Sequence, residues 1–204
     1  MKKNHLVIVF FIGLISTNAP LQTNSARADG LPSVFNGKDL TGWKVPENNV
    51  WWKAEDGLLK VSSGPDQQGS TLWTEKAYAN FVMEFEFKLG EGTVDSGVFV
   101  RNENEQIQIG ISGSLKRDMT ASPYIAHKGY PVEATGVKEL LKLDDWNAMT
   151  IVAKGKNYTV WLNGQHVMTY DSDSAVEKGP IGIQLHGSRN MSIDYRNITL
   201  AELN

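Results

Sequence analysis

The sequence predicts an all-β protein, built as an antiparallel sandwich of two sheets of the jelly-roll kind. Short segments in which apolar and polar residues alternate recur along the chain, separated by turn residues such as Asn, Asp and Gly. This pattern is typical of sandwiches and jelly rolls. A helical pattern is confined to residues 137–143, which suffice for one or two turns.

The chain begins with a segment that has the pattern of an export signal. A basic start precedes the mostly apolar residues 6–15, and a small-x-small cleavage site ends at Ala28. The apolar run is shorter than the roughly 20 residues that a membrane helix needs. We therefore expect residues 1–28 to be a signal peptide and residues 29–204 to be one domain without a membrane span, exported to the bacterial periplasm or outside the cell.

The composition narrows the range of functions. The chain has no cysteine, so an exported domain must be held together by its hydrophobic core and not by disulfides. Its formal net charge of −3 argues against nucleic acid as a partner, because nucleic-acid binding needs a basic surface. The six tryptophans suit a large core and also a sugar-binding cleft.

The first half of the domain contains a series of predicted strands joined by turns. The clearest is residues 81–89, where Phe, Met and Leu alternate with Glu and Lys, so that one face is buried. Residues 55–57, Glu-Asp-Gly, form a hairpin signal between two strands. The predicted strands are, in order, residues 34–35, 50–54, 58–61, 71–74, 81–89, 96–101 and 106–111.

Two of these strands carry polar residues whose faces follow from alternation. Arg101 comes two residues after Phe99 and is therefore expected on the same side of the sheet. In residues 106–111, Gln106 and Gln108 are expected on the side opposite to the isoleucines. Polar residues on an open face of a sheet are either solvated or part of a binding groove.

Residues 112–145 form a long connection without a regular period. The stretch that holds Tyr124 and His127 predicts loop or short strand, and the helical turns at residues 137–143 follow it. Connections of this length in a compact domain are usually functional.

The last part of the chain returns to strands, at residues 146–154, 157–162, 165–170, 181–185 and 191–198. Asn163-Gly164 is a strong signal for a two-residue hairpin turn. In residues 181–185 the apolar odd-numbered positions alternate with the others, so Gln184 shares the open face with His186. This face is the predicted centre of any binding site.

Short motifs recur in a fixed order along almost the whole domain, at residues 35–43, 95–101, 145–147, 161–164, 179–187 and 196–198. Together they resemble the 3-keto-disaccharide hydrolase domain family. The resemblance implies a concanavalin A-like sandwich of the lectin and glucanase type. It also implies hydrolase or lyase activity on 3-keto-glycosides, cleaved by elimination and hydration or by net hydrolysis, with a glycoside or oligosaccharide as partner.

The sequence departs from the family pattern in one strand. Members of the family commonly carry Tyr-Glu-x-Gln there, whereas residues 105–108 read Glu-Gln-Ile-Gln. The amide of Gln106 stands in place of the family carboxylate and cannot titrate. The neighbouring Glu105 is expected to point to the other face.

The implied chemistry needs a base, donors for an oxyanion and a flat apolar wall. A ketone at C3 acidifies the C2 proton of the sugar, and the enolate formed on its removal expels the C1 substituent. His186 is the candidate base because histidine titrates near neutral pH, the alternative being a surface histidine. Arg101 is the candidate electrophile or substrate anchor, the alternative being a salt bridge to Glu84 or Glu86.

Other polar and aromatic residues are candidate substrate ligands. Tyr124 and His127 would supply a second acid or base, or a lid, or else are merely exposed. Trp43 and Trp73 would stack on a sugar ring, or else belong to the core. The glutamines expected to bind sugar hydroxyls, unless they are simply solvated, are Gln106, Gln108 and Gln184.

The sequence contains no recognisable cofactor or metal motif. Calcium binding by scattered acids such as Asp39, Asp95 and Asp194 depends on the fold and stays open. An enzyme on 3-keto-sugars is the first hypothesis, a non-catalytic carbohydrate-binding module the second and a structural or adhesion domain the third. The enzyme hypothesis requires Arg101 and His186 in one pocket. The sequence does not define the oligomeric state.

Overall fold

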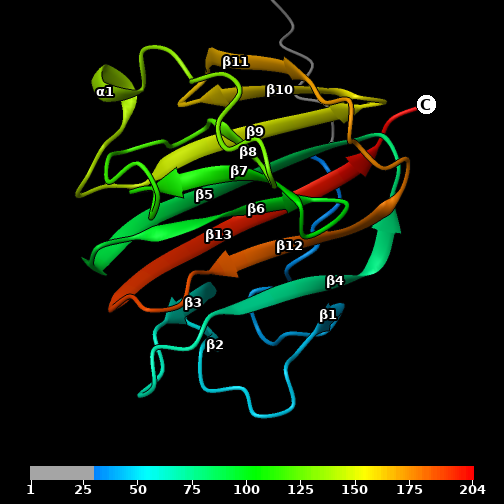
Figure 1. Cartoon of the computed structure of the whole chain (residues 1–204). Coiled ribbons are helices and arrows are strands. Elements are labelled where there is room, and N and C mark those ends of the chain that lie inside the picture. The colour runs from blue at the N-terminus through cyan, green and yellow to red at the C-terminus, as the bar shows by residue number, and fades with distance from the viewer. Residues whose placement is uncertain (1–29) are drawn as a thin grey trace, which may run out of the picture.

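The computed structural model describes residues 30–204, which form two antiparallel sheets packed against each other (Figure 1). One sheet has the strand order β1-β4-β12-β6-β7-β8, and the other has the order β11-β10-β9-β5-β13-β3-β2. The prediction of an all-β two-sheet sandwich is confirmed. The predicted signal peptide lies outside the described residues, and no helix within residues 30–204 is long and apolar enough to cross a membrane.

Most strands coincide with predicted segments, but Trp43–Lys44 was not predicted as a strand, and the strands that begin at Ser70 and Met191 run four residues beyond their predicted ends. The six-stranded sheet contains β1 (Trp43–Lys44), β4 (Ser70–Tyr78), β6 (Asp95–Val100), β7 (Glu105–Gly110), β8 (Pro123–Ile125) and β12 (Gly179–Leu185). The seven-stranded sheet contains β2 (Trp52–Glu55), β3 (Leu58–Ser62), β5 (Phe81–Gly92), β9 (Asn147–Lys154), β10 (Asn157–Leu162), β11 (Gln165–Asp171) and β13 (Met191–Glu202). The helical segment α1 (Val137–Leu140) is a single turn.

The start of the domain differs from the prediction. Residues 34–35 form no strand, and the isolated bridge lies one residue earlier, between Ser33 and β13. Phe35 is buried in the core, and Gly37 follows with a left-handed φ of 73°. The chain therefore turns before a ladder can extend, because a left-handed residue breaks the pleat.

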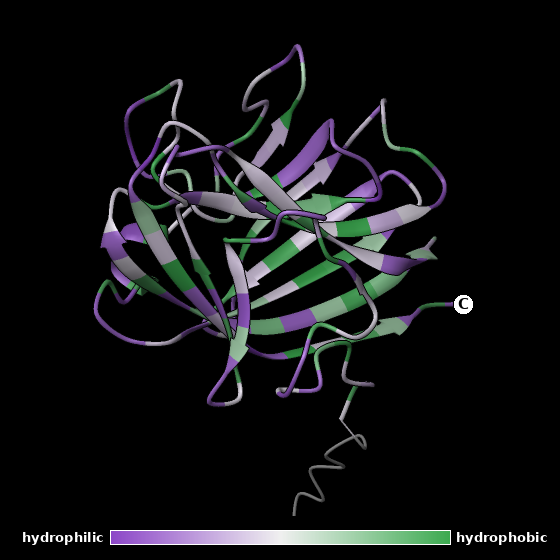
Figure 2. Cartoon of the chain, turned by 90° about the horizontal axis from the view of Figure 1, so that it is seen from below, coloured by the Kyte–Doolittle hydropathy of each residue, from purple (hydrophilic) through white to green (hydrophobic). Residues whose placement is uncertain are grey.

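The core lies between the inner faces of the two sheets. Along β5, Phe81, Met83 and Phe85 are buried and alternate with more exposed residues. β12 also buries Ile181 and Ile183 in the core. Figure 2 shows this alternation as green and pale or purple bands along the strands. Burial of these rows provides the main driving force for packing the sheets together, because the hydrophobic effect scales with the apolar area removed from water.

The opposite face of the six-stranded sheet, here called the outer face, points away from the core. The long connection between β7 and β9 begins beside this face, and several of its residues wall a cavity there. The outer face and this connection together position the candidate site.

Candidate functional site

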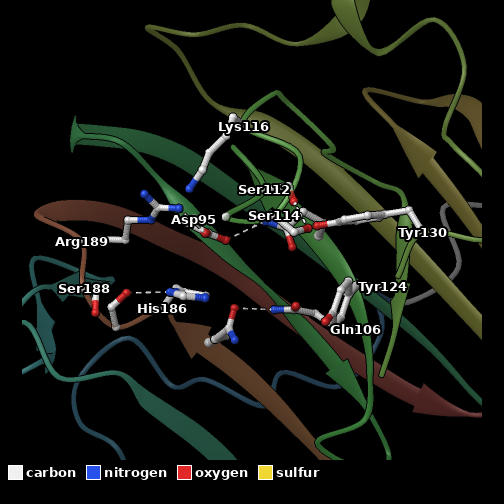
Figure 3. A pocket seen from close by; sticks show the side chains of 14 residues that line it. Asp95, Gln106, Ser112, Ser114, Lys116, Tyr124, Tyr130, His186, Ser188 and Arg189 are labelled. Atoms are coloured by element: carbon white, nitrogen blue, oxygen red, sulfur yellow. Dashed lines mark hydrogen bonds and ion pairs between the residues drawn. The ribbon is translucent and has the colours of Figure 1, made fainter. Parts of the chain in front are cut away.

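The outer face carries a cavity of about 590 Å³. Its floor comes from side chains of β6, β7 and β12, and its walls come from the β7–β9 connection and from the loop after β12 (Figure 3). The floor residues are Asp95, Gln106, Gln108 and Gln184, with His186 at the end of β12. The wall residues used below are Ser112, Lys116, Tyr124, Tyr130 and Arg189.

Strand register aligns the floor residues in rows. Gln184 of β12 lies opposite Gly97 of β6, and Gly97 lies opposite Gln108 of β7. In the next row, Phe99 of β6 lies opposite Gln106. Because side chains two residues apart share a face, the three glutamines point to the same side of the sheet. The sequence prediction placed these glutamines correctly.

Gly97 allows two of the glutamines to meet. Gln106 Nε2 donates to Gln184 Oε1 over a distance of 2.7 Å. A Cβ atom on Gly97 would lie only 2.4 Å from Gln106 Nε2, so a larger residue would displace this amide. The contact leaves the Gln106 carbonyl oxygen and the Gln184 amino group to bind a ligand.

Asp95 anchors the polar end of the cavity. Its side chain is nearly fully buried, at 2% exposure. Oδ1 accepts a hydrogen bond of 2.9 Å from Gln108 Nε2, and Oδ2 accepts one of 3.2 Å from Arg189 Nη2. The carboxylate therefore fixes the direction of both neighbours, because charge-assisted hydrogen bonds are strong and directional.

His186 presents a basic nitrogen near this carboxylate. Its Nδ1 lies 2.6 Å from the carbonyl oxygen of Gly187. Since a carbonyl only accepts, Nδ1 carries the hydrogen, and the lone pair of the neutral ring is on Nε2. A Cβ atom on Gly113 would lie 3.8 Å from Nε2 and 3.1 Å from Asp95 Oδ2, so both groups border the same space.

Two cations and a tyrosine provide donors around this space. Figure 3 shows the Lys116 side chain directed toward the Arg189–Asp95 pair. Arg189 Nε is buried and has no hydrogen-bond partner among residues 30–204. Burial raises the pKa of Tyr130 to about 12, so at neutral pH its hydroxyl keeps its proton and remains a donor. Tyr130 packs edge-on against Tyr124, with ring centroids 5.3 Å apart.

The sequence matches the model of the 3-keto-alpha-glucoside-1,2-lyase-like domain over residues 30–201. The chain belongs to this lyase-like domain family.

The chain is also similar to a 3-keto-disaccharide hydrolase and to a solved structure of a putative glycosyl hydrolase. A 3-keto-disaccharide hydrolase of Bacteroides thetaiotaomicron is 32% identical over 83 residues, which are 35% of this chain and 27% of that protein. The match thus spans about a quarter of that relative's length. A putative glycosyl hydrolase of Parabacteroides distasonis is 25% identical, with 86% of this chain and 100% of that chain covered and a TM-score of 0.65.

A sugar-binding protein shares the fold as well. The carbohydrate binding module CBM66 from Bacillus subtilis is 14% identical, with 79% of this chain and 96% of that chain covered and a TM-score of 0.58. The fold of the lyase-like domain family is therefore also that of a binding module, and the fold alone does not separate the two functions.

The structure of this lyase-like domain departs furthest from the sequence prediction at Arg101. Arg101 does not line the cavity; it is buried at 2% exposure and donates to the carbonyl oxygens of Ala79, Gly155 and Val176. Strand β6 ends at Val100, and Arg101 has a left-handed φ of 67°, so strand alternation no longer applies to it. The expected convergence of Arg101 with His186 is wrong.

Two further predicted ligands lie elsewhere. Trp43 is buried in the core, where its Nε1 donates to the Val34 carbonyl oxygen over 2.9 Å. His127 is exposed on a turn with a left-handed φ of 67° and does not line the cavity. Tyr124, which the sequence grouped with His127, does line it.

Glu105 points to the inner side of β7, as its alternation with Gln106 predicts. It is fully buried and accepts hydrogen bonds from Tyr158, Ser172 and Ser174. The carboxylate next to the family position therefore does not face the cavity. Among residues 30–204, no group of three or more His, Cys, Asp or Glu side chains has the arrangement of a metal site.

Sequence reasoning missed Asp95 as the anchor of the site and several residues of the cavity wall, namely Ser112, Lys116, Tyr130 and Arg189. Asp95 alternates with Gly97, so extending the predicted strand by one residue would have placed it on the outer face. The wall residues come from loops whose path no period reveals.

Proposed function

We propose that this protein is an exported enzyme that cleaves 3-keto-glycosides, with His186 as the base that removes the C2 proton. The observation that carries the proposal is the orientation of His186. Its Nδ1 donates to the Gly187 carbonyl oxygen, which leaves the lone pair on Nε2, and the residue lines a cavity with cationic donors. Membership of the lyase-like domain family supports the substrate class. Export follows from the leader pattern of residues 1–28 and is tested by fractionating cells that express the full chain.

In the proposed reaction, Nε2 takes the C2 proton and the electron pair of the C2–H bond forms an enolate with the C3 ketone. Lys116 and Arg189 stabilise the developing negative charge, because fixed donors act strongly on charge that forms in the transition state. The enolate then expels the C1 substituent, which takes the proton held on Nε2. Water adds its hydroxyl at C1 and supplies the new proton at C2, so the net reaction is hydrolysis.

The glutamines and Asp95 orient the sugar in this scheme. The Gln106 carbonyl oxygen, the Gln184 amino group and the Gln108 carbonyl oxygen face hydroxyls of the ring, while Asp95 holds Gln108 and Arg189 in place. Such positioning accelerates a reaction by keeping the reacting atoms in line. Arg101 has no part in it.

The test uses a 3-keto-glucoside with a chromogenic leaving group. We compare the parent with His186→Asn, which removes the base, and with His166→Asn as the control, since His166 lies on β11 and contacts Thr169. We expect release by the parent and the control, and a loss of about 100-fold or more with His186→Asn. Equal release by His186→Asn and the parent would exclude His186 as the base.

A carbohydrate-binding module is the second candidate function. The observation that favours it is Gln106, whose amide replaces the usual family carboxylate and binds Gln184 instead of titrating. A module would bind the 3-keto-glycoside saturably without releasing the leaving group. Calorimetric titration beside the chromogenic assay separates the two functions.

A further inference from the structure

The loop between β3 and β4, residues 63–69, supports the site without lining the cavity. It packs against the loop between β12 and β13, residues 186–190, which carries both His186 and Arg189. Figure 3 shows these two side chains at the same end of the cavity. The β3–β4 loop can therefore control their positions without touching a ligand.

The backbones of the two loops meet at a pair of glycines. A Cβ atom on Gly69 would lie only 2.9 Å from the backbone nitrogen of Gly187, and one on Gly187 would lie 2.8 Å from the nitrogen of Gly69. Gly69 does not have a left-handed φ, so an alanine at this position would be opposed by the contact and not by its own backbone conformation. The close approach of the loops is thus the reason for glycine here.

The glycine contact fixes the group that orients the candidate base. The carbonyl oxygen of Gly187 lies 2.6 Å from His186 Nδ1, which keeps the lone pair of the neutral ring on Nε2. The next residue, Ser188, donates its backbone N–H to the Gln67 carbonyl oxygen over 2.7 Å. A shift of the β3–β4 loop would therefore move the acceptor of the His186 ring.

Ser63 holds the other end of the β12–β13 loop. Its Oγ donates to the carbonyl oxygen of Arg189 over 2.8 Å and accepts from the backbone nitrogen of Met191 over 3.1 Å. The backbone nitrogen of Ser63 donates to the Met191 carbonyl oxygen over 3.0 Å. One hydroxyl thus satisfies two backbone groups beside Arg189, whose side chain reaches Asp95 in the cavity.

We propose that Gly69 and Ser63 are positioning residues, Gly69 acting on His186 through Gly187 and Ser63 acting on Arg189 through its backbone. The inference rests on the proposed function, in which His186 removes the C2 proton and Arg189 stabilises the enolate. A misplacement of about 1 Å can cost about 100-fold in rate. The two contacts therefore govern the chemical step more than sugar binding, which the glutamines of the floor provide.

The test of Gly69 compares Gly69→Ala with Gly64→Ala, a matched control in the same loop. A Cβ atom on Gly64 would meet only the side chains of Trp51 and Val50, at 3.0 Å. We expect Gly69→Ala to lower kcat on the 3-keto-glucoside about tenfold or more and to keep KM within about threefold, whereas Gly64→Ala should keep both. Unchanged kcat in Gly69→Ala, or an equal loss in Gly64→Ala, would overturn the role of Gly69.

A double-mutant cycle tests Ser63 independently of any folding defect in Gly69→Ala. Ser63→Ala removes the hydroxyl and should lower kcat about tenfold, whereas Ser63→Thr keeps the hydroxyl and should retain most of the activity. Because Ser63 acts through Arg189, Ser63→Ala should lower kcat little further in an Arg189→Met background. Equal losses in both backgrounds, or no loss in either, would overturn the positioning role. Urea unfolding of each variant verifies that kcat is measured on folded protein.

NMR of the imidazole nitrogens separates this inference from the proposed function. With the His186 signals assigned by comparison with His186→Asn, the neutral ring of the parent should carry its hydrogen on Nδ1. Gly69→Ala should give a mixture of both tautomers, and Gly64→Ala should resemble the parent. If the parent cleaves no 3-keto-glucoside yet shows these signals, the proposed enzyme is wrong and the positioning of His186 stands. An unchanged tautomer in Gly69→Ala would overturn the inference.

Discussion

Replacing Arg101 with methionine should destabilise the protein and leave its chemistry intact. The guanidinium donates three hydrogen bonds, to Ala79 over 2.6 Å and to Gly155 and Val176 over 2.7 and 3.1 Å. These carbonyls belong to three separate turns or loops at one end of the sandwich. Arg101→Met removes every one of these donors and also takes a positive charge away from the buried Glu105.

The magnitude follows from the burial of these groups. A hydrogen bond to a charged group contributes about 1.5–3 kcal/mol, and removing one charge from a buried cluster costs about 3–5 kcal/mol. We take about 3–5 kcal/mol for the whole change, because the three bonds share one side chain and are not additive. With a urea m-value of about 2 kcal/mol/M, the unfolding midpoint should fall by about 1.5–2.5 M.

The assay is urea unfolding followed by tryptophan fluorescence, beside kcat/KM on the 3-keto-glucoside below the unfolding transition. Arg117→Met is the matched control, because Arg117 pairs with Glu133 on the surface and such pairs contribute about 0–1 kcal/mol. We expect Arg101→Met to keep kcat/KM within about tenfold of the parent, or about 1.4 kcal/mol. An unchanged midpoint with a complete loss of activity would refute the structural role and restore Arg101 as a functional residue.

Three further predictions concern the floor, the core and alkaline pH. Gly97→Ala should weaken sugar binding and destabilise the fold by about 1–3 kcal/mol, because its Cβ would lie 2.4 Å from Gln106 Nε2; calorimetry and urea unfolding test this, and unchanged affinity would contradict it. Trp43→Phe should cost about 1–3 kcal/mol of stability, through the lost bond to Val34, without changing sugar affinity; a weakened affinity at full stability would argue for a ligand role. Burial raises the pKa of Tyr130 from an ordinary value of about 10 to about 12, so its stabilisation is complete below the ordinary tyrosine pKa and is lost as the pH rises through the folded value. The urea midpoint should therefore fall between about pH 10 and 12, less steeply in Tyr130→Phe, and a flat profile would contradict this.

Regular strands were predictable because their signal is local. The alternation in residues 81–89 and 181–185 identified β5 and β12, and the Asn163-Gly164 signal identified the β10–β11 turn, where both residues have positive φ. The same alternation placed the three glutamines on one face. A period of two thus determines which residues share a face, whatever the tertiary arrangement.

The site was predicted only as far as strand alternation extends. Arg101 follows the last residue of β6, and its left-handed backbone turns the side chain toward the core. The cavity walls, including Lys116 and Arg189, come from loops, where contacts over long sequence separations decide the path. Trp43 was predicted as a cleft or a core residue, with the core ranked first for any single tryptophan, and its indole packs in the core.

Solvent deuterium incorporation tests the central claim most directly. The parent and His186→Asn are each given the 3-keto-glucoside in D₂O, and the 3-keto-sugar product is taken at early times for mass spectrometry, with product incubated alone as the control for spontaneous exchange. Removal of the C2 proton followed by hydration predicts one deuterium at C2 in the product of the parent. His186→Asn should lower the rate of deuterium incorporation and the rate of leaving-group release by the same factor. Release by the parent without deuterium at C2 would contradict the account, because the glycosidic bond would then be cleaved without C2 proton abstraction.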